Sequence, residues 1–464
     1  MQYSGRVSAT RLRVPVIHHI SLIMQAVLNT MTADILIINA VLLPGPGFPW
    51  GTDQSYVAVK NGRIAGTGPM DALDEIQAGE RIDAGGGLLM PGLVNAHCHG
   101  AMTLFRGLAD DLELMTWLNV HIFPAEAAYV NPQMVYWCSK LAAAEMLLSG
   151  TTMVADAYFY EAEAARAFSE AGLRAVAAHG VIDFPAPGVS DPRENIRAVA
   201  RFLDHWQGKD PLVTPAIFAH SPYTCSPETL IGAKALAKER GVRFFIHVAE
   251  SRAEQGLIKN PRGSSPVKHL DALGVLDEQT VCVHCVWVDE EDLAILARRQ
   301  SKIVLCPQSH LKLASGMAPL ADMLAAGIEV GLGTDGAASN NGLDMFREMD
   351  ICAKVQKLRT LDPVGIRAGD VLRMATAGGA EVLAMEEGAG QLRPGSPADL
   401  VLVDLNRLHL QPFHGPDLLV YAAQGSDVTT VIVNGKIVVR DRRLLTFDLE
   451  ETMRRVRELA EALS

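Results

Sequence analysis

Two histidines close a short apolar run, Pro91-Gly-Leu-Val-Asn-Ala-His-Cys-His-Gly100, which is bounded by glycines. Alternate side chains of a β-strand point to the same face, so His97 and His99 would leave one face together. Two neighbouring imidazoles at a strand end are placed to hold one metal ion. A His-x-His pair is weak support by itself, because paired surface histidines are common. The prediction of a metal site therefore depends on further ligands elsewhere in the chain.

Three other apolar segments end in residues that could complete such a site. The segment Val242-Arg-Phe-Phe-Ile-His247 ends in a histidine and is soon followed by Glu250, and Thr280-Val-Cys-Val-His284 ends in another histidine. Residues 327–335 end in an aspartate. Each of these residues alone is more often a core histidine or a capping aspartate, but their coincidence at strand ends favours a shared site.

A zinc-like divalent ion accepts imidazole nitrogens and carboxylate oxygens, and a catalytic site keeps one position open for water. Glu250 would approach that water without binding the ion, and His284 would act as a hydrogen-bonding or proton-relay group. The candidate ligands of one catalytic metal ion are His97, His99, His247 and Asp335.

The middle of the chain, residues 91–391, alternates short apolar strands with helical stretches. Eight strand–helix units in roughly 300 residues are typical of an α/β fold, the (β/α)8 TIM-type barrel. The catalytic groups of such barrels lie at the C-terminal ends of the strands, so distant residues meet at one mouth. The predicted strands end at His99, Asp156, Asp183, His220, His247, His284, Pro307 and Asp335.

Both ends of the chain read differently from the middle. Residues 31–90 and 392–447 contain short strands and two Asn-Gly hairpin signals, Asn61-Gly62 and Asn434-Gly435. They predict a small composite β-sandwich built from both ends. Residues 448–464 are expected to form a C-terminal surface helix. Residues 1–30 are expected to be a disordered N-terminal extension outside the fold.

Composition limits the kinds of partner. The chain has 464 residues, is 49% hydrophobic and carries a formal net charge of -12, which argues against a nucleic-acid or anionic-membrane surface. No uninterrupted apolar run reaches the ~18–20 residues that a membrane helix needs. The seven cysteines form no disulfide framework and are typical of a reducing cytoplasm. We therefore expect a cytoplasmic protein that binds neither nucleic acid nor membrane.

From about residue 33 to about residue 445 the chain resembles the amidohydrolase superfamily, specifically the methylthioadenosine/S-adenosylhomocysteine deaminases. The run that ends in His97 and His99 is similar to the metal-binding first strand of that family, and residues 104–112 are similar to its substrate-covering loop. The resemblance extends to Ala219-His-Ser-Pro-Tyr223, His247-Val-Ala-Glu250, Ser309-His-Leu-Lys-Leu313 and Gly333-Thr-Asp-Gly-Ala-Ala-Ser-Asn-Asn341.

The resemblance implies one metal ion per subunit, Zn²⁺ or alternatively Fe²⁺, on the four candidate ligands. It also implies that Glu250 and His284 assist catalysis, with Glu250 contacting the substrate as well. Glu126 and His220 would bind the ribose hydroxyls, and Trp117 would pack near the nucleoside or its 5' substituent. A carboxylate and an imidazole are suitable acceptors for two adjacent hydroxyl donors. The family is commonly oligomeric, so the resemblance implies a homo-oligomer.

The implied reaction is hydrolytic deamination of an adenine nucleoside. Metal-bound hydroxide would attack C6, while Asp335 and His284 orient it and accept its proton. Glu250 would deliver a proton to N1 and so make C6 electrophilic. The implied substrates are 5'-methylthioadenosine and S-adenosylhomocysteine, which would yield 5'-methylthioinosine and S-inosylhomocysteine, with 5'-deoxyadenosine and adenosine as further candidates.

The chain departs from the family pattern at the seventh strand. It reads Cys306-Pro-Gln-Ser-His310, where the family more often has Asn-Pro at the start and asparagine before Leu-Lys-Leu. A basic partner for the homocysteine carboxylate is also undecided, since either Arg193 or Arg197 could serve.

Two alternatives stay open. The same metal site serves deaminases and chlorohydrolases of free purine bases or triazine-like heteroaromatics, but a ribose-binding pair such as Glu126 and His220 would have no purpose there. A metal-free structural member of the superfamily would be expected to lack ligands, whereas this sequence has all four.

Overall fold

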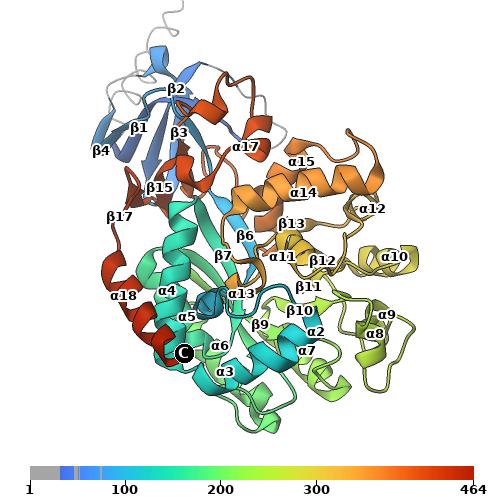
Figure 1. Cartoon of the computed structure of the whole chain (residues 1–464). Coiled ribbons are helices and arrows are strands. Elements are labelled where there is room, and N and C mark those ends of the chain that lie inside the picture. The colour runs from blue at the N-terminus through green and yellow to red at the C-terminus, as the bar shows by residue number, and fades with distance from the viewer. Residues whose placement is uncertain (1–31, 46–50, 52, 74–75, 464) are drawn as a thin grey trace, which may run out of the picture.

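The computed structural model describes residues 32–45, 51, 53–73 and 76–463. The predicted extension over residues 1–30 lies outside the described residues. Figure 1 shows a barrel covered by helices, with a second sheet above it.

The barrel is built from eight strands that pair in chain order, each parallel to the next. The first and last of them meet where the backbone N–H of Asp335 donates to the carbonyl of His97 at 3.0 Å. This arrangement confirms the predicted (β/α)8 fold. The strands are β6 (Leu93–Cys98), β7 (Thr151–Tyr158), β8 (Arg174–Val181), β9 (Val213–Ala219), β10 (Phe244–Val248), β11 (Thr280–His284), β12 (Lys302–Leu305) and β13 (Val330–Leu332).

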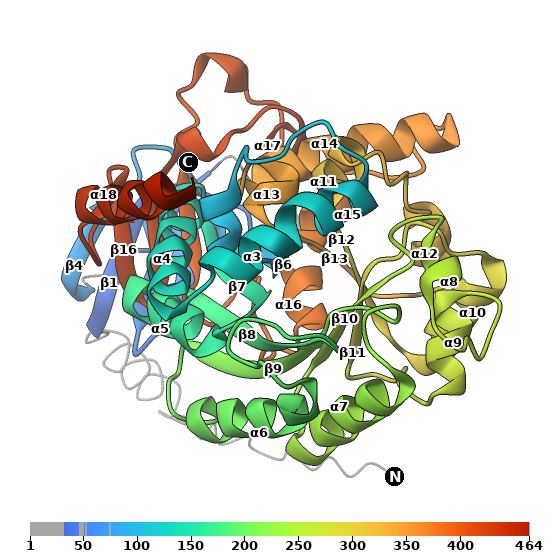
Figure 2. The ribbon, with the colours of Figure 1, turned by 60° about the horizontal axis from the view of Figure 1, so that its bottom comes forward.

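Helices surround these strands, as Figure 2 shows from the side of the barrel mouth. Several begin at residues whose side chains accept hydrogen bonds from the first turn, as Asn131, Ser226 and Asp289 do. The longer helices are α4 (Pro132–Leu148), α5 (Glu161–Ala171), α6 (Asn195–Trp206), α7 (Pro227–Arg240), α9 (Pro266–Ala272), α10 (Glu290–Arg299), α14 (Met345–Thr360) and α15 (Ala368–Met374).

Shorter helices lie mainly in the loops that follow the strands. Those near the mouth are α2 (Leu114–Thr116), α3 (Phe123–Tyr129), α8 (Glu254–Leu257), α11 (Pro307–Lys312) and α13 (Ala337–Asn340). Of two more, α12 (Leu320–Ala325) precedes β13 and α16 (Ala377–Val382) packs against β13 and β6, while α17 (Asp417–Tyr421) follows the barrel.

The second sheet joins strands from both ends of the chain. Its path runs β17-β16-β15-β14-β5-β1-β2-β3, with β4 also paired to β1, and one of its faces forms an apolar core of its own. The strands are β1 (Thr32–Leu42), β2 (Gln54–Lys60), β3 (Arg63–Pro69), β4 (Gln77–Asp83), β5 (Leu88–Pro91), β14 (Leu400–Val403), β15 (Val428–Val433), β16 (Lys436–Arg440) and β17 (Arg443–Leu444).

Both predicted Asn-Gly hairpins are present, and the sheet folds back so that their turns meet. Gly62 accepts a hydrogen bond from Ala398, which in turn accepts one from Gly435. Gly435 has a φ of 70°, and a Cβ there would lie 2.6 Å from the Cα of Gly62. Only glycine satisfies both the left-handed backbone and this close approach.

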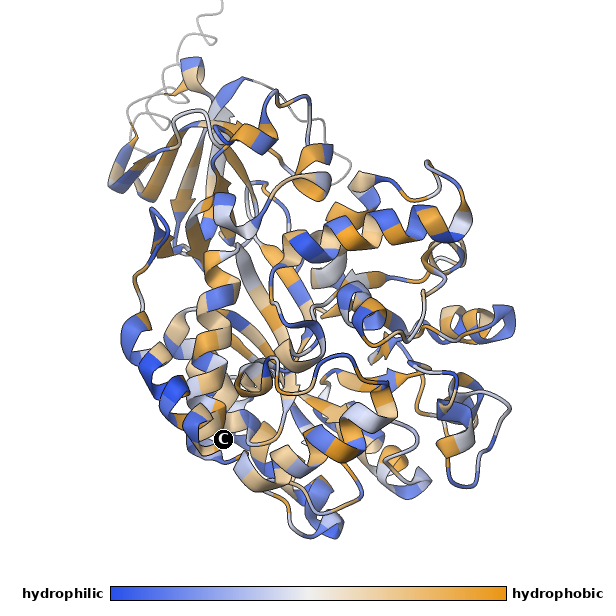
Figure 3. Cartoon of the chain, viewed as in Figure 1, coloured by the Kyte–Doolittle hydropathy of each residue, from blue (hydrophilic) through white to orange (hydrophobic). Residues whose placement is uncertain are grey.

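The C-terminal helix α18 (Leu449–Ala460) packs against α4 and is strongly polar along its outer face (Figure 3). Among the described residues, no helix is both long and apolar enough to cross a bilayer.

Candidate active site

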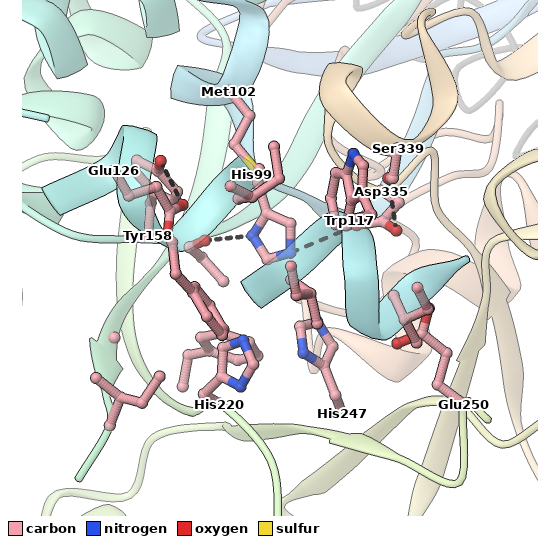
Figure 4. A pocket seen from close by; sticks show the side chains of 18 of the residues that line it. His99, Met102, Trp117, Glu126, Tyr158, His220, His247, Glu250, Asp335 and Ser339 are labelled. Atoms are coloured by element: carbon pink, nitrogen blue, oxygen red, sulfur yellow. Dashed lines mark hydrogen bonds and ion pairs between the residues drawn. The ribbon is translucent and has the colours of Figure 1, made fainter. Parts of the chain in front are cut away.

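A cavity of about 730 Å³, open to solvent, lies at the C-terminal ends of the barrel strands (Figure 4). Its lining is mostly apolar, with acids and histidines at a few positions, as is typical of a small-molecule site. Eight of the nine predicted site residues line it: His99, Trp117, Glu126, His220, His247, Glu250, His284 and Asp335. The ninth, His97, lies fully buried beside His99 and His247, with its ring centroid 4.7 and 5.2 Å from theirs.

The four candidate ligands converge closely. His97 Nε2 lies 3.3 Å from His247 Nε2, and Asp335 Oδ1 lies 3.4 Å from His99 Nε2 and 3.7 Å from His97 Nε2. Tetrahedral zinc with Zn–N bonds of 2.0–2.1 Å holds two ligand nitrogens roughly 3.3 Å apart. The three histidines also form a potential metal-binding group by distance alone. This donor set therefore fits a divalent ion.

Hydrogen bonds turn two of the candidate ligands, His99 and Asp335, toward the others. His99 Nδ1 donates to the carbonyl of Ala157 at 2.5 Å, which leaves Nε2 free for a metal ion. Asp335 Oδ2 accepts from the hydroxyls of Ser309 and Ser339 at 2.7 and 2.9 Å, so that Oδ1 is turned toward the histidines. These outer contacts fix which atom of each ligand faces the site.

The backbone of β6 and the turn after β13 must approach closely for this geometry to form. Asn95 exchanges hydrogen bonds with Thr334, and a Cβ on Gly333 would lie 2.7 Å from the backbone N and O of His97. A side chain at residue 333 would therefore push His97 and Asp335 apart.

Burial and the neighbouring groups shift the pKa values of the candidate ligands. Burial lowers the pKa of His99 to about 4, assisted by the nearby charge of His97, and it lowers the pKa of His247 well below its usual value. Burial alone would raise the pKa of Asp335, but contact with His97 and the charges of His99 and His284 outweigh it and hold that pKa well below the ordinary range. Neutral imidazoles and an ionised carboxylate are the forms that bind a metal ion.

Glu250 and His284 face each other beside the ligands. Glu250 Oε2 lies 3.7 Å from His284 Nε2. Burial, together with the charges of Asp335 and Glu254, raises the pKa of Glu250 well above its usual value. Burial also lowers the pKa of His284 well below its usual value. A carboxyl group with a raised pKa beside an imidazole with a lowered pKa is a pairing suited to general acid–base chemistry.

A second polar group lies on the other side of His99 in Figure 4. Glu126 accepts a hydrogen bond of 2.7 Å from the Tyr158 hydroxyl, and His220 Nδ1 lies 3.0 Å from Thr224 Oγ1. Burial raises the pKa of Glu126 to about 7. Trp117 begins the π-helical turn η3 (Trp117–Ile122) that joins α2 to α3 above the cavity.

The structure does not bring the two candidate arginines to the cavity. The Arg193 side chain is 88% exposed and pairs with Asp191, while the Arg197 side chain is 71% exposed and pairs with Glu194. Neither lines the cavity, and no lysine or arginine does so among the described residues.

Three contributors are absent from the predicted set: Tyr158, Ser309 and Ser339. The predicted strand end at Asp156 is wrong by two residues, because β7 continues to Tyr158. With the strand extended, Tyr158 would have been the polar residue at the mouth. The two serines lie on short helices that no apolar periodicity reveals.

Comparison with known proteins agrees with this geometry. The model of the amidohydrolase family matches residues 88–438. The chain is 45% identical over 438 residues to 5-methylthioadenosine/S-adenosylhomocysteine deaminase of Syntrophobacter fumaroxidans, covering 94% of this chain and all of the relative. It is 43% identical to 5'-deoxyadenosine deaminase of Methanothermobacter thermautotrophicus, covering 91% and 98% of the two chains.

Among solved structures, an adenosine deaminase from Xanthomonas campestris with bound zinc superposes with a TM-score of 0.90 at 36% identity, covering 94% of this chain and 99% of that one. With a family model that matches most of the sequence, and relatives above 40% identity along nearly its whole length, the chain belongs to the amidohydrolase family, among the 5-methylthioadenosine/S-adenosylhomocysteine deaminases.

Proposed function

We propose that this protein is a metal-dependent deaminase of adenine nucleosides, acting on 5'-methylthioadenosine, S-adenosylhomocysteine or 5'-deoxyadenosine. One observation carries the proposal. A single cavity holds a metal-type donor set with an acid beside it and, across His99, a carboxylate and an imidazole suited to adjacent hydroxyls. The names of relatives at 43–45% identity supply the substrates.

The proposed ion is Zn²⁺, one per subunit, with Fe²⁺ as a competitor for the same donors. An ion bound by His97, His99, His247 and Asp335 would supply a Lewis acid that lowers the pKa of a coordinated water toward about 7. The zinc in the related solved adenosine deaminase supports this choice.

Each residue around the proposed metal ligands then takes part in a particular proton transfer. Glu250, whose pKa is raised by burial, gives its proton to N1 of the adenine ring, which makes C6 electrophilic. His284 and Asp335 orient the attacking water and accept its proton. The proton taken from water by His284 and Asp335 passes to the C6 amino group, and the C6–N bond breaks to release ammonia. The hydroxyl proton of the intermediate returns to Glu250 as the C6 carbonyl forms, and the proton on N1 stays in the 6-oxo product. Water is consumed and one ammonia is released per turnover.

Glu126 and His220 position the substrate through the ribose. Replacing Glu126 with glutamine is expected to reduce kcat/KM for 5'-methylthioadenosine by about 10–100-fold, because a hydrogen bond to a charged group contributes about 1.5–3 kcal/mol. The measurement compares the variant and the wild type on the ribonucleoside and on its 2'-deoxy and 3'-deoxy analogues. At least one deoxy analogue should lose much less than the ribonucleoside. An equal loss on all three would contradict a ribose role.

The same carboxyl group predicts a pH dependence. Because the pKa of Glu126 is raised to about 7, the group is increasingly protonated below that pH and loses its capacity to accept two hydroxyls. We expect KM for 5'-methylthioadenosine to rise as the pH falls from about 8 to about 6. Initial rates over this range test it, and the E126Q variant should show a flatter KM profile. An unchanged slope in E126Q would assign the effect to another group.

The function itself is tested by ammonia release from nucleosides and from competing substrate classes. We expect release from 5'-methylthioadenosine and 5'-deoxyadenosine, and none from adenine, guanine or an aminotriazine. Turnover of a free base or a triazine without turnover of any nucleoside would replace this proposal with the free-base alternative.

A further inference from the structure

His284, which lines the cavity, is in contact with a second histidine behind it. The Nδ1 atom of His284 lies 3.0 Å from Nε2 of His310, and both side chains are buried. The two ring centroids lie 5.2 Å apart at an interplanar angle of 64°. His310 is absent from the cavity lining, so it reaches the reacting groups only through His284.

Helix α11 fixes His310 firmly. Pro307 opens the helix, the His310 N–H donates to the carbonyl of Cys306, and the His310 carbonyl accepts from Ser315. The preceding residue, Ser309, donates to Asp335 Oδ2 at 2.7 Å. Two consecutive residues of one short helix therefore contact two different groups of the site, the carboxylate of Asp335 and the imidazole of His284.

Two neutral imidazoles at this distance must share one proton. A neutral imidazole carries one N–H, and of the two buried nitrogens that face each other at 3.0 Å one must donate and the other must accept. If His284 Nδ1 donates, its Nε2 is a bare acceptor facing the cavity. If His310 Nε2 donates, His284 Nε2 must carry the hydrogen and becomes a donor.

The surroundings of Nε2, on the cavity side of the His284 ring, favour the arrangement in which Nδ1 of His284 donates to His310. The Nε2 atom of His284 faces the cavity and lies 3.7 Å from the carboxyl of Glu250, the group that gives its proton to the substrate in the proposed function. Two donors pointing at each other would repel, whereas a bare Nε2 is compatible with a neighbouring O–H.

We propose that His310 is a positioning residue that accepts a hydrogen bond from Nδ1 of His284 and thereby keeps Nε2 of His284 as a proton acceptor toward the cavity. The hydrogen bond also fixes the ring plane. The tautomer assignment rests on the proposed function for the acid role of Glu250, but the spectrum described next decides it whether or not a nucleoside is turned over.

The direct test is a long-range ¹H–¹⁵N correlation spectrum of protein labelled with ¹⁵N-histidine, recorded as purified and after addition of zinc. The H284Q variant identifies the His284 signals by their loss. We expect wild-type His284 to show a protonated Nδ1 and a bare Nε2. A protonated Nε2 would overturn the proposal. This experiment uses no His310 variant, so its outcome does not depend on whether such a variant folds.

Variants at His310 test the consequence. H310L should lower kcat by about 10–100-fold with KM changed little, and should leave His284 as a mixture of tautomers. H310Q retains a carbonyl acceptor and should recover part of both properties. Unchanged His284 signals and unchanged kcat in H310L would overturn the proposal. If no nucleoside is turned over at all, the spectrum still decides the His284 tautomer, so the two proposals fail separately.

His269 provides a matched control. It is a fully buried histidine on α9 whose Nδ1 accepts from the backbone of Arg262, and it does not line the cavity. H269L removes a buried histidine by the same substitution and should leave kcat and the His284 signals as in the wild type. A loss equal to that of H310L would show that the His310 effect is general destabilisation.

Discussion

Replacing Glu250 with glutamine is expected to lower kcat for nucleoside deamination by about 10²–10⁴-fold while leaving the metal content unchanged. Glutamine has nearly the same shape as a protonated glutamic acid but has no acidic proton to give to N1. Glu250 is not one of the four proposed ligands and faces His284 at 3.7 Å, so the ligands should remain in place.

The measurement is kcat and KM for 5'-methylthioadenosine together with metal analysis of the same samples. Glu161 offers a matched control, since it is a fully buried glutamate that does not line the cavity. E161Q should retain most of the wild-type kcat per folded protein. An active E250Q variant with full metal content would remove Glu250 from the proposed proton transfers.

Loss of a metal ligand should have an effect at least as large. In His247→Asn we expect less than a tenth of the wild-type metal content, and kcat/KM lower by more than about 100-fold, because losing partners outside the ligand set already costs 10–100-fold. His247 Nε2 lies 3.3 Å from His97 Nε2, so removing it opens one side of the donor set.

Thermal unfolding gives a readout that does not depend on activity. An ion that binds only the folded protein stabilises it by about 4 kcal/mol at a thousandfold excess over Kd. Zinc should therefore raise the Tm of chelator-treated wild type and should fail to raise that of H247N. His179, a half-buried histidine on β8 stacked on Phe202, is the matched control, and H179N should keep both metal and activity. An H247N variant that binds zinc like the wild type would contradict this ligand assignment.

The sequence was sufficient to predict the barrel and the convergence of its strand ends. His97, His247 and His284 each end a short apolar run, and parallel strands in a barrel must bring such ends to one mouth. The two Asn-Gly turns could also be predicted from the sequence, because only a few residue types adopt the backbone conformation of such turns.

Other features depend on contacts between residues far apart in the chain. The pairing of β14 with β5, which unites the two chain ends in one sheet, has no local signal. Arg193 lies in the loop after β8, where it pairs with Asp191 instead of lining the cavity. The path of that loop cannot be predicted from apolar periodicity. The contact between His310 and His284 likewise arises only once α11 packs behind β11.

The central claim is most directly tested by the ultraviolet absorbance of 5'-methylthioadenosine, S-adenosylhomocysteine, 5'-deoxyadenosine and adenosine during incubation with metal-replete protein. Conversion of the adenine ring to its 6-oxo form changes the spectrum directly. We predict turnover of at least one of the four by the wild type, abolished by chelation and restored by zinc. Stoichiometric bound metal with no turnover of any of them would contradict the account.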